Sequence, residues 1–269
     1  MIETIFILRH GFRSNFVNAN WTNATQTPRD PALTAFGETQ AQECAEYFMS
    51  LPVEERPTAI FSSPYYRCIQ TSKPIVQALG IPLFLEHGVS EWYSPVSPGT
   101  GLHPRPPSAA GMHEYFPGLL DESWSSVWYP SRKGEDVGQI HARTAGFLEA
   151  FIPEVEKKIP QSHARILLVA HAATVITLTR ELLADKVVPL RIGCCTLTEL
   201  KRKPDAPILG GWTPTLVASG DHLKEGIQRD WGFEDIIVSD DGQVIDDVGL
   251  GGPEEDEGPV GCQIQRSSL

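Results

Sequence analysis

Three short stretches of the chain consist mostly of apolar residues and are rich in β-branched side chains. They are TIFIL at 4–8, TAIFSS at 58–63 and RILLVA at 165–170. Uninterrupted apolar runs of this length are typical of strands that are buried on both faces of a parallel sheet. Two later segments, 194–200 and 212–218, also have the composition of strands. The pattern therefore predicts a central sheet of largely parallel strands.

Four segments between these strands repeat apolar residues with the period of a helix, at 33–51, 64–80, 135–159 and 172–184. The first begins with Thr34, a residue that caps helices. The second is expected to begin at Pro64 and end at Gly80, with a kink or break at Pro74. Because strands and helices alternate, we expect an α/β fold, a doubly wound, mostly parallel sheet with helices on both faces.

The chain divides into one large domain and a tail. Residues 1–238 are expected to form the domain. Within it, 92–135 is rich in Pro, Gly, Ser and aromatic residues and is too long for a simple connection, so we expect an insertion that forms a lid over one end of the sheet. Residues 239–269 are acidic and have no periodic pattern, and we expect them to be disordered.

Charge and composition exclude several classes of protein. The formal net charge is -12, and residues 239–261 hold a large share of the carboxylates. Non-specific binding to nucleic acid needs a basic surface, so we expect no direct contact with nucleic acid. No apolar stretch reaches the roughly 18 to 20 residues of a membrane span, and the N-terminus lacks the basic region of a signal peptide. The five cysteines show no zinc-binding spacing. We expect a soluble protein with reduced thiols in the cytoplasm, the nucleus or both.

A histidine follows two of the predicted strands. His10 comes after the first strand, directly behind Arg9, and His171 comes directly after the strand at 165–170. In open parallel sheets, ligands bind at the carboxyl ends of the strands. We therefore expect the two imidazoles to converge on one ligand.

Three arginines, Arg9, Arg13 and Arg67, accompany these histidines. Guanidinium groups recognise a tetrahedral phosphate through paired hydrogen bonds. Their charge also keeps a neighbouring imidazole neutral, which leaves it able to attack phosphorus. Departure of the leaving group needs an acid, and Glu91 at the mouth of the insertion is the candidate. Together these side chains favour phosphoryl transfer through a phosphohistidine.

Four motifs of the chain resemble, in the same order, those of the histidine phosphatase superfamily, whose fold is called phosphoglycerate-mutase-like. They are LRHG at 8–11, LTAFGETQA at 33–41, SSPYYRCIQT at 62–71 and LLVAHAAT at 167–174. The resemblance covers roughly residues 4–185.

The resemblance implies a role for each candidate residue. It implies that His10 is the nucleophile and that Glu91 donates the proton to the leaving group. Arg9, Arg67 and His171 would form the phosphate pocket, with His171 also counted among the catalytic residues. The resemblance further implies that neither a metal nor a cofactor takes part.

Two positions separate the chain from the mutases of this family. Mutases usually carry glutamate two residues after the first histidine, where this chain has Phe12. Arg13 instead resembles the RHGER type of the ubiquitin-associated, SH3-containing protein phosphatases, in which this arginine joins the phosphate pocket. The segments RHGFRSNF, EWYSP and YFPGLLDESW resemble the histidine-phosphatase-like subunit of the yeast RNA polymerase III transcription factor IIIC, or a free-standing paralogue of it.

Three functions therefore stay open. The first is hydrolysis of phosphomonoesters, on a phosphorylated small molecule or a phosphoprotein. The second is a protein-interaction module of a transcription factor IIIC-like assembly with weak or residual phosphatase activity. The third is a mutase, which would depend on a bisphosphate primer. We favour the phosphatase because every residue that the chemistry requires is present.

Aromatic residues of the insertion bear on the choice of substrate. They are Trp92, Tyr93, Phe116, Trp124 and Trp128. If they line the pocket, we expect aryl phosphates such as phosphotyrosine peptides to be preferred over sugar phosphates. The alternative is that they pack the insertion onto the sheet.

Overall fold

The computed structural model describes residues 1–159, 164–237 and 256–264. Its centre is a six-stranded sheet in the order β3-β2-β5-β1-β6-β7. β6 is antiparallel to both of its neighbours, and the other five strands run in one direction. The strands are β1 (Thr4–Arg9), β2 (Ala59–Ser62), β3 (Leu83–Leu85), β5 (Arg165–Ala170), β6 (Leu197–Arg202) and β7 (Trp212–Ser219). The predicted α/β class with a mostly parallel sheet is confirmed.

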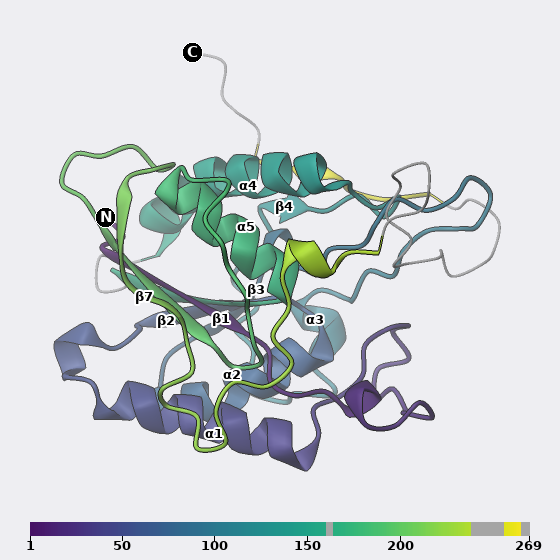
Figure 1. Cartoon of the computed structure of the whole chain (residues 1–269), viewed down its shortest axis with the longest axis horizontal. Coiled ribbons are helices and arrows are strands. Elements are labelled where there is room, and N and C mark those ends of the chain that lie inside the picture. Colours follow the sequence, from purple (N-terminus) through teal and green to yellow (C-terminus); the bar gives the residue numbers. More distant parts are fainter. Residues whose placement is uncertain (160–163, 238–255, 265–269) are drawn as a thin grey trace.

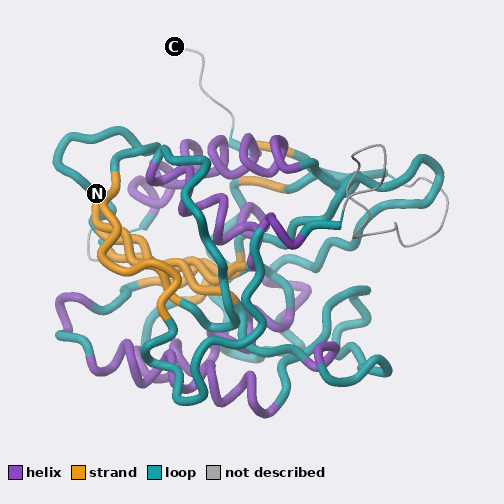
Figure 2. The backbone as a smooth tube through the Cα atoms, viewed as in Figure 1, coloured by secondary structure: helices purple, strands orange, loops and turns teal. Residues whose placement is uncertain are grey.

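Helices cover both faces of this sheet (Figures 1 and 2). On one face lie α1 (Ala35–Ser50) and α2 (Tyr66–Leu79), and on the other lie α4 (Val137–Lys158) and α5 (Ala172–Leu183). The short helix α3 (Ala109–Met112) belongs to the insertion. Single 3-10 turns occur at Ser14–Phe16, Val53–Glu55, His87–Val89 and Phe233–Asp235. Among the described residues, no helix combines the length and the apolar character that crossing a membrane requires.

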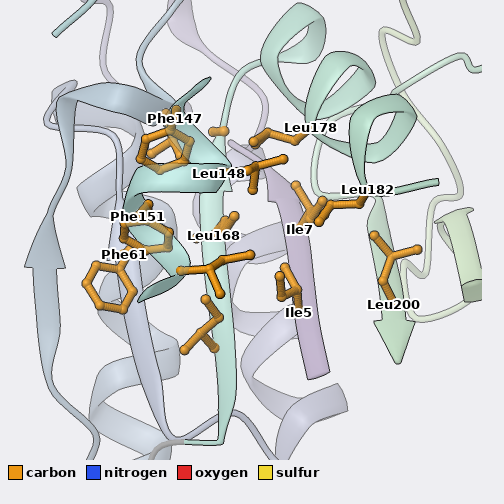
Figure 3. Close-up of a cluster of buried hydrophobic side chains, with 14 of the residues drawn as sticks. Ile5, Ile7, Phe61, Phe147, Leu148, Phe151, Leu168, Leu178, Leu182 and Leu200 are labelled. Atoms are coloured by element: carbon orange, nitrogen blue, oxygen red, sulfur yellow. The ribbon is translucent and has the colours of Figure 1, made fainter. Parts of the chain in front are cut away.

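The alternation of side chains along β1 explains why the sheet is covered twice. Ile5 and Ile7 pack with residues of α4 and α5, whereas Phe6 and Leu8 pack with residues of α1 and α2. Figure 3 shows the first of these two layers. Burial of each such side chain stabilises the fold by about 1.5–3 kcal/mol. Both faces of this central strand are buried, so its sequence is an uninterrupted run of mostly apolar residues.

The start of α1 and the end of α2 follow the signals in the sequence, whereas the start of α2 does not. Thr34 caps α1, and its Oγ1 accepts a hydrogen bond from the backbone N–H three residues later at 3.0 Å. Gly80 ends α2 in the left-handed conformation, with φ 65°. α2 begins at Tyr66 rather than at the predicted Pro64, and it continues through Pro74 without a break. Buried side chains on either side of this proline hold α2 on the sheet.

The insertion predicted at 92–135 is joined to a segment near the C-terminus. In the insertion, β4 (Trp128–Tyr129) pairs antiparallel with β8 (Gly261–Cys262). The carboxylate of Glu257 accepts hydrogen bonds from the insertion as well, from Ser131 Oγ at 2.5 Å and from the N–H of Arg132 at 2.7 Å.

The structure thus differs from the expected disorder of 239–269 at residues 256–264. A strand of two residues has too few positions to show alternation, so the sequence carries no signal for it. Its pairing is decided by the insertion, which is far away in the sequence. Residues 239–255 and 265–269 of this tail lie outside the described residues.

The first turn of α1 lies against the loop that follows β1, and a glycine stands on each side of the contact. A Cβ on Gly11 would lie 2.7 Å from the carbonyl oxygen of Gly37, and a Cβ on Gly37 would overlap the carbonyl of Phe12. Both neighbours are backbone atoms, which cannot turn aside as a flexible side chain can. The two glycines therefore determine how closely α1 approaches the loop that carries His10.

We expect Gly37→Ala to lower the free energy of unfolding by about 1–3 kcal/mol, the usual cost of forcing extra volume into a packed region. Thr39→Ala, at an exposed position of the same helix, is the matched control and should change it by less than about 0.5 kcal/mol. Urea unfolding followed by circular dichroism measures both. Equal stability of the two variants would mean that this contact relaxes without cost.

Candidate active site

The six predicted site residues meet at one edge of the sheet. The register of the parallel pair β1 and β5 places Arg9 beside Ala170, so the next residues, His10 and His171, are neighbours with ring centroids 5.4 Å apart. Arg67 stands in the first turn of α2, directly after β2. A cavity of about 420 Å³ opens at this edge, and its lining residues are Arg9, His10, Arg13, Asn15, Trp21, Arg29, Pro31, Arg67, Glu91, Trp92, Tyr93, Ala172, Ala173 and Trp231.

His10 is held as a neutral imidazole with a defined tautomer. Its Nδ1 lies 2.8 Å from the carbonyl oxygen of Gly11. A carbonyl can only accept a hydrogen bond, so Nδ1 carries the proton and Nε2 keeps its lone pair. Burial, reinforced by the charges of Arg67 and Arg9, lowers the pKa of His10 well below its usual value. The residue therefore offers an unprotonated nitrogen at neutral pH.

Arg67 is a fully buried cation that two carboxylates hold in place. Its Nη1 donates to Asp30 Oδ1 at 3.0 Å, and its Nη2 donates to Glu91 Oε2 at 3.0 Å. Burial acts against its charge, but the two carboxylates outweigh burial and raise the pKa of Arg67. Because a buried charge without a partner costs several kcal/mol, Asp30 is needed for Arg67 to stand here.

His171 and Glu91 form a pair beside this arginine. His171 Nδ1 lies 3.2 Å from Glu91 Oε2, and its Nε2 lies 2.8 Å from Ser63 Oγ. Arg67 Nη2 also lies 3.1 Å from Nδ1, so this nitrogen faces both a carboxylate and a guanidinium donor. Burial lowers the pKa of His171 to about 4, although Glu91 acts against this shift.

The carboxyl of Glu91 is ionised when the cavity is empty. Burial acts to raise its pKa, but His171 and Arg67 outweigh burial and hold the pKa of Glu91 well below its usual value. A group in this state accepts protons poorly. A role as proton donor therefore requires a change in its surroundings when a ligand binds.

Arg9 and Arg13 complete the group of guanidinium ions. Arg9 Nη1 donates to the backbone carbonyls of Ile192 and Arg229, at 2.6 and 2.5 Å. The Arg13 guanidinium carbon lies 4.6 Å from the centre of the Phe16 ring. Burial, with a contribution from the charge of a neighbouring arginine, lowers the pKa of Arg13 to about 10, so it stays charged at neutral pH.

These arginines retain donors that the described residues do not satisfy. The Nε atoms of Arg9, Arg13 and Arg67 are buried and have no hydrogen-bond partner within the described ranges. Buried donors are paired in nearly all native structures. Independently of these atoms, the three arginines all line the cavity, and their positive charge favours an anion with several acceptor oxygens, such as a phosphoryl group.

Two residues of the cavity lining, His10 and Glu91, form with the buried His171 a set of groups of the kind that hold a cation. The nearest ligand atoms of His10, Glu91 and His171 lie within 4.8 Å of one another. Arg67 already occupies Glu91 Oε2, however, and further guanidinium groups line the cavity. Their repulsion makes the cavity a better site for an anion than for a metal ion.

The aromatic residues of the insertion divide into two groups. Trp92 and Tyr93 line the cavity. Phe116 packs instead on α2, while Trp124 and Trp128 pack in the core beneath α4. The expectation of an aromatic pocket thus holds for two of these residues, and the packing alternative holds for the other three.

Sequence reasoning missed several residues of the site. Trp21, Arg29 and Asp30 come from the loop before α1, and Trp231 comes from the segment after β7. Trp21 is a single tryptophan among polar residues, which is a weak signal for a ligand-binding side chain. Residues 29–31 and 231 belong to none of the four motifs, so only the three-dimensional structure shows that they lie near the histidines.

Phe12 occupies the position at which mutases carry glutamate. Its ring packs on Phe16 and Phe36, with centroids 5.1 and 5.5 Å away. The position is thus part of an aromatic cluster that supports the loop after β1, which contains Arg13. It supplies no carboxylate.

Comparison with known proteins agrees with this geometry. The sequence profile of the histidine phosphatase superfamily (branch 1) matches residues 5–214. The transcription factor tau 55 kDa subunit of Saccharomyces cerevisiae is 33% identical over 268 aligned positions, which cover 87% of this chain and 59% of that protein. The chain thus spans about three fifths of the length of this relative.

Solved structures share the fold at low identity. The ecdysone phosphate phosphatase from Bombix mori, solved in complex with tungstate, has a TM-score of 0.61 and 18% identity over 86% of this chain and 96% of that one. The mycobacterial glucosyl-3-phosphoglycerate phosphatase has a TM-score of 0.53 and 19% identity over 81% of this chain and 99% of that one. The family predicted from the four motifs is confirmed, and the chain belongs to the histidine phosphatase superfamily.

Proposed function

We propose that the protein hydrolyses phosphomonoesters through a phosphohistidine on His10, without a metal or cofactor. The observation that carries the proposal is the unprotonated Nε2 of His10 beside a cavity that Arg9, Arg13 and Arg67 line. Membership of the histidine phosphatase superfamily supports it. Guanidinium groups also supply the positive charge that a metal ion provides in other phosphatases.

The reaction has two steps. In the first, His10 Nε2 forms a bond to phosphorus while the bond from phosphorus to the ester oxygen breaks, and Glu91 gives a proton to that oxygen. In the second, a water oxygen attacks phosphorus, the phosphorus–nitrogen bond breaks, and Glu91 takes the proton of the water. Arg9, Arg13, Arg67 and His171 hold the transferring group and stabilise its charge in both steps.

Glu91 becomes a suitable acid when the phosphoryl group binds. In the empty cavity the carboxylate accepts a hydrogen bond from the Nη2 of Arg67 and contacts the Nδ1 of His171. A phosphoryl group competes for the guanidinium and brings negative charge beside the carboxylate. Both effects raise the pKa of Glu91. Binding is therefore coupled to uptake of the proton that the leaving group later receives.

A second candidate function is assembly into a transcription factor IIIC-like complex in the nucleus, in place of or beside catalysis. The 33% identity to the tau 55 kDa subunit supports it. The net charge of -12 favours protein partners over nucleic acid. This function needs no turnover, so a measurement of hydrolysis separates it from the first.

We expect His10→Ala to lower kcat for para-nitrophenyl phosphate in the presence of EDTA by at least about 1,000-fold, because the bond to phosphorus can no longer form. His113→Ala is the matched control, since His113 is exposed and paired with Glu122 on the surface, and it should retain full activity. Wild-type turnover no faster than that of His10→Ala would favour the assembly function. Turnover that appears only after a bisphosphate is added would indicate a mutase.

We expect wild-type protein to bind sulfate more tightly as the pH falls from about 8 to 5, by up to about tenfold per pH unit. The pKa of Glu91 is low in the empty site and rises when sulfate takes its partners, so protonation favours the bound state. Glu91→Gln should bind more tightly at pH 8 and lose most of this dependence. Isothermal titration calorimetry measures both, and the exposed Glu54→Gln is the control. The same pH dependence in all three proteins would contradict the coupling.

A further inference from the structure

The cavity is larger than a phosphoryl group needs, and aromatic side chains line the remainder. Arg9, Arg13 and Arg67 surround the site for the phosphoryl group. The cavity of about 420 Å³ is also lined by Trp21, Trp92, Tyr93 and Trp231. These four rings come from three separate parts of the chain. The space they border is where the group attached to the phosphate must lie.

Trp231 belongs to a segment beyond residue 214, at which the match to the family profile ends. The segment is tied to the loop before β6 by two backbone hydrogen bonds between Ile192 and Trp231, at 2.9 and 3.2 Å. Arg9 Nη1 donates to the carbonyls of Ile192 and Arg229, one from each of these segments. The arginine that would bind the phosphoryl group thus also positions the segment that contains Trp231.

Ring packing makes this wall rigid. Trp231 lies 6.2 Å from Trp92 and 5.3 Å from Phe233, measured between centroids. The indole N–H of Trp92 donates to the carbonyl of Glu135 at 2.7 Å. A salt-bridge cluster of Arg191 with acidic residues of the same segment lies on the outer side. The indole of Trp231 is therefore held in place before any ligand arrives.

Trp21 presents a different kind of surface. It lies in the loop between the turn Ser14–Phe16 and α1, and it is only partly buried. Within the described ranges its side chain makes no ring contact and no hydrogen bond, and it belongs to none of the apolar clusters. A tryptophan that lines a cavity without packing partners of its own has an open ring face for a ligand.

We propose that Trp21, Trp92 and Trp231 select a planar aromatic leaving group, so that the preferred substrates are aryl phosphates. This inference rests on the proposed phosphatase function. Planar rings gain from stacking on indole faces, whereas a sugar needs many hydrogen-bond partners that indole faces do not offer. Trp21 and Trp92 lie within the matched family region and Trp231 lies beyond it, so part of the specificity would come from a segment outside that region.

The test compares an aryl with an aliphatic substrate. We expect Trp231→Ala and Trp21→Ala each to raise KM for 1-naphthyl phosphate about tenfold with little change in kcat, because stacking acts equally on substrate and transition state. KM for glycerol 1-phosphate should change by less than about twofold. Inhibition by inorganic phosphate, which has no leaving group, should be unchanged.

Two further variants keep the inference open to contradiction. Trp231→Phe should recover most of the affinity for 1-naphthyl phosphate, and Val17→Ala, at an exposed position four residues before Trp21 in the chain, should behave as wild type. Equal losses for both substrates with weaker inhibition by phosphate would mean that Trp231 only supports Arg9, which overturns the inference. Unchanged KM values in both tryptophan variants would also overturn it. Absence of hydrolysis of either substrate by wild-type protein would instead contradict the phosphatase function itself.

Discussion

Concentrated positive charge in one largely buried cavity is the constraint on which the other features of the site depend. Arg9 and Arg67 are at most 5% exposed, and charges in such surroundings are tolerated when they have partners. Asp30 and Glu91 neutralise Arg67, while backbone carbonyls take part of the donors of Arg9. Together with Arg13 these guanidinium groups line the cavity and give it a positive field. The cavity is thus preorganised for a charge that the protein itself does not contain.

Much of the fold was predictable because its signals are local. The strands β1 and β5 are apolar runs, α1 begins at a threonine cap, and α2 ends at a glycine. The convergence of His10 and His171 follows from a general property of parallel sheets, since both come directly after neighbouring strands. Arg67 could be added because it lies in the first turn of the helix after β2.

The remaining site residues could not be predicted because long-range contacts bring them together. Asp30 reaches Arg67 across 37 positions of the chain, and Arg229 reaches Arg9 across 220. No periodicity or motif reports on such contacts. β8 was missed for the same reason, since its partner β4 lies in the insertion. The aromatic residues of the insertion show the same limit. Composition alone did not distinguish Trp92, which lines the cavity, from Trp124, which packs in the core.

The hydrogen bonds from Arg9 to the carbonyls of Ile192 and Arg229 have a consequence for biosynthesis. The strand β1 emerges from the ribosome together with His10, Arg9 and Arg13. The carbonyls that hold Arg9 emerge some two hundred residues later. Until then the growing chain carries these cations without the partners that allow them to be buried. The nascent protein can therefore assemble helices and strands in order, but the cavity is complete only after Ile192 and Arg229 have been added.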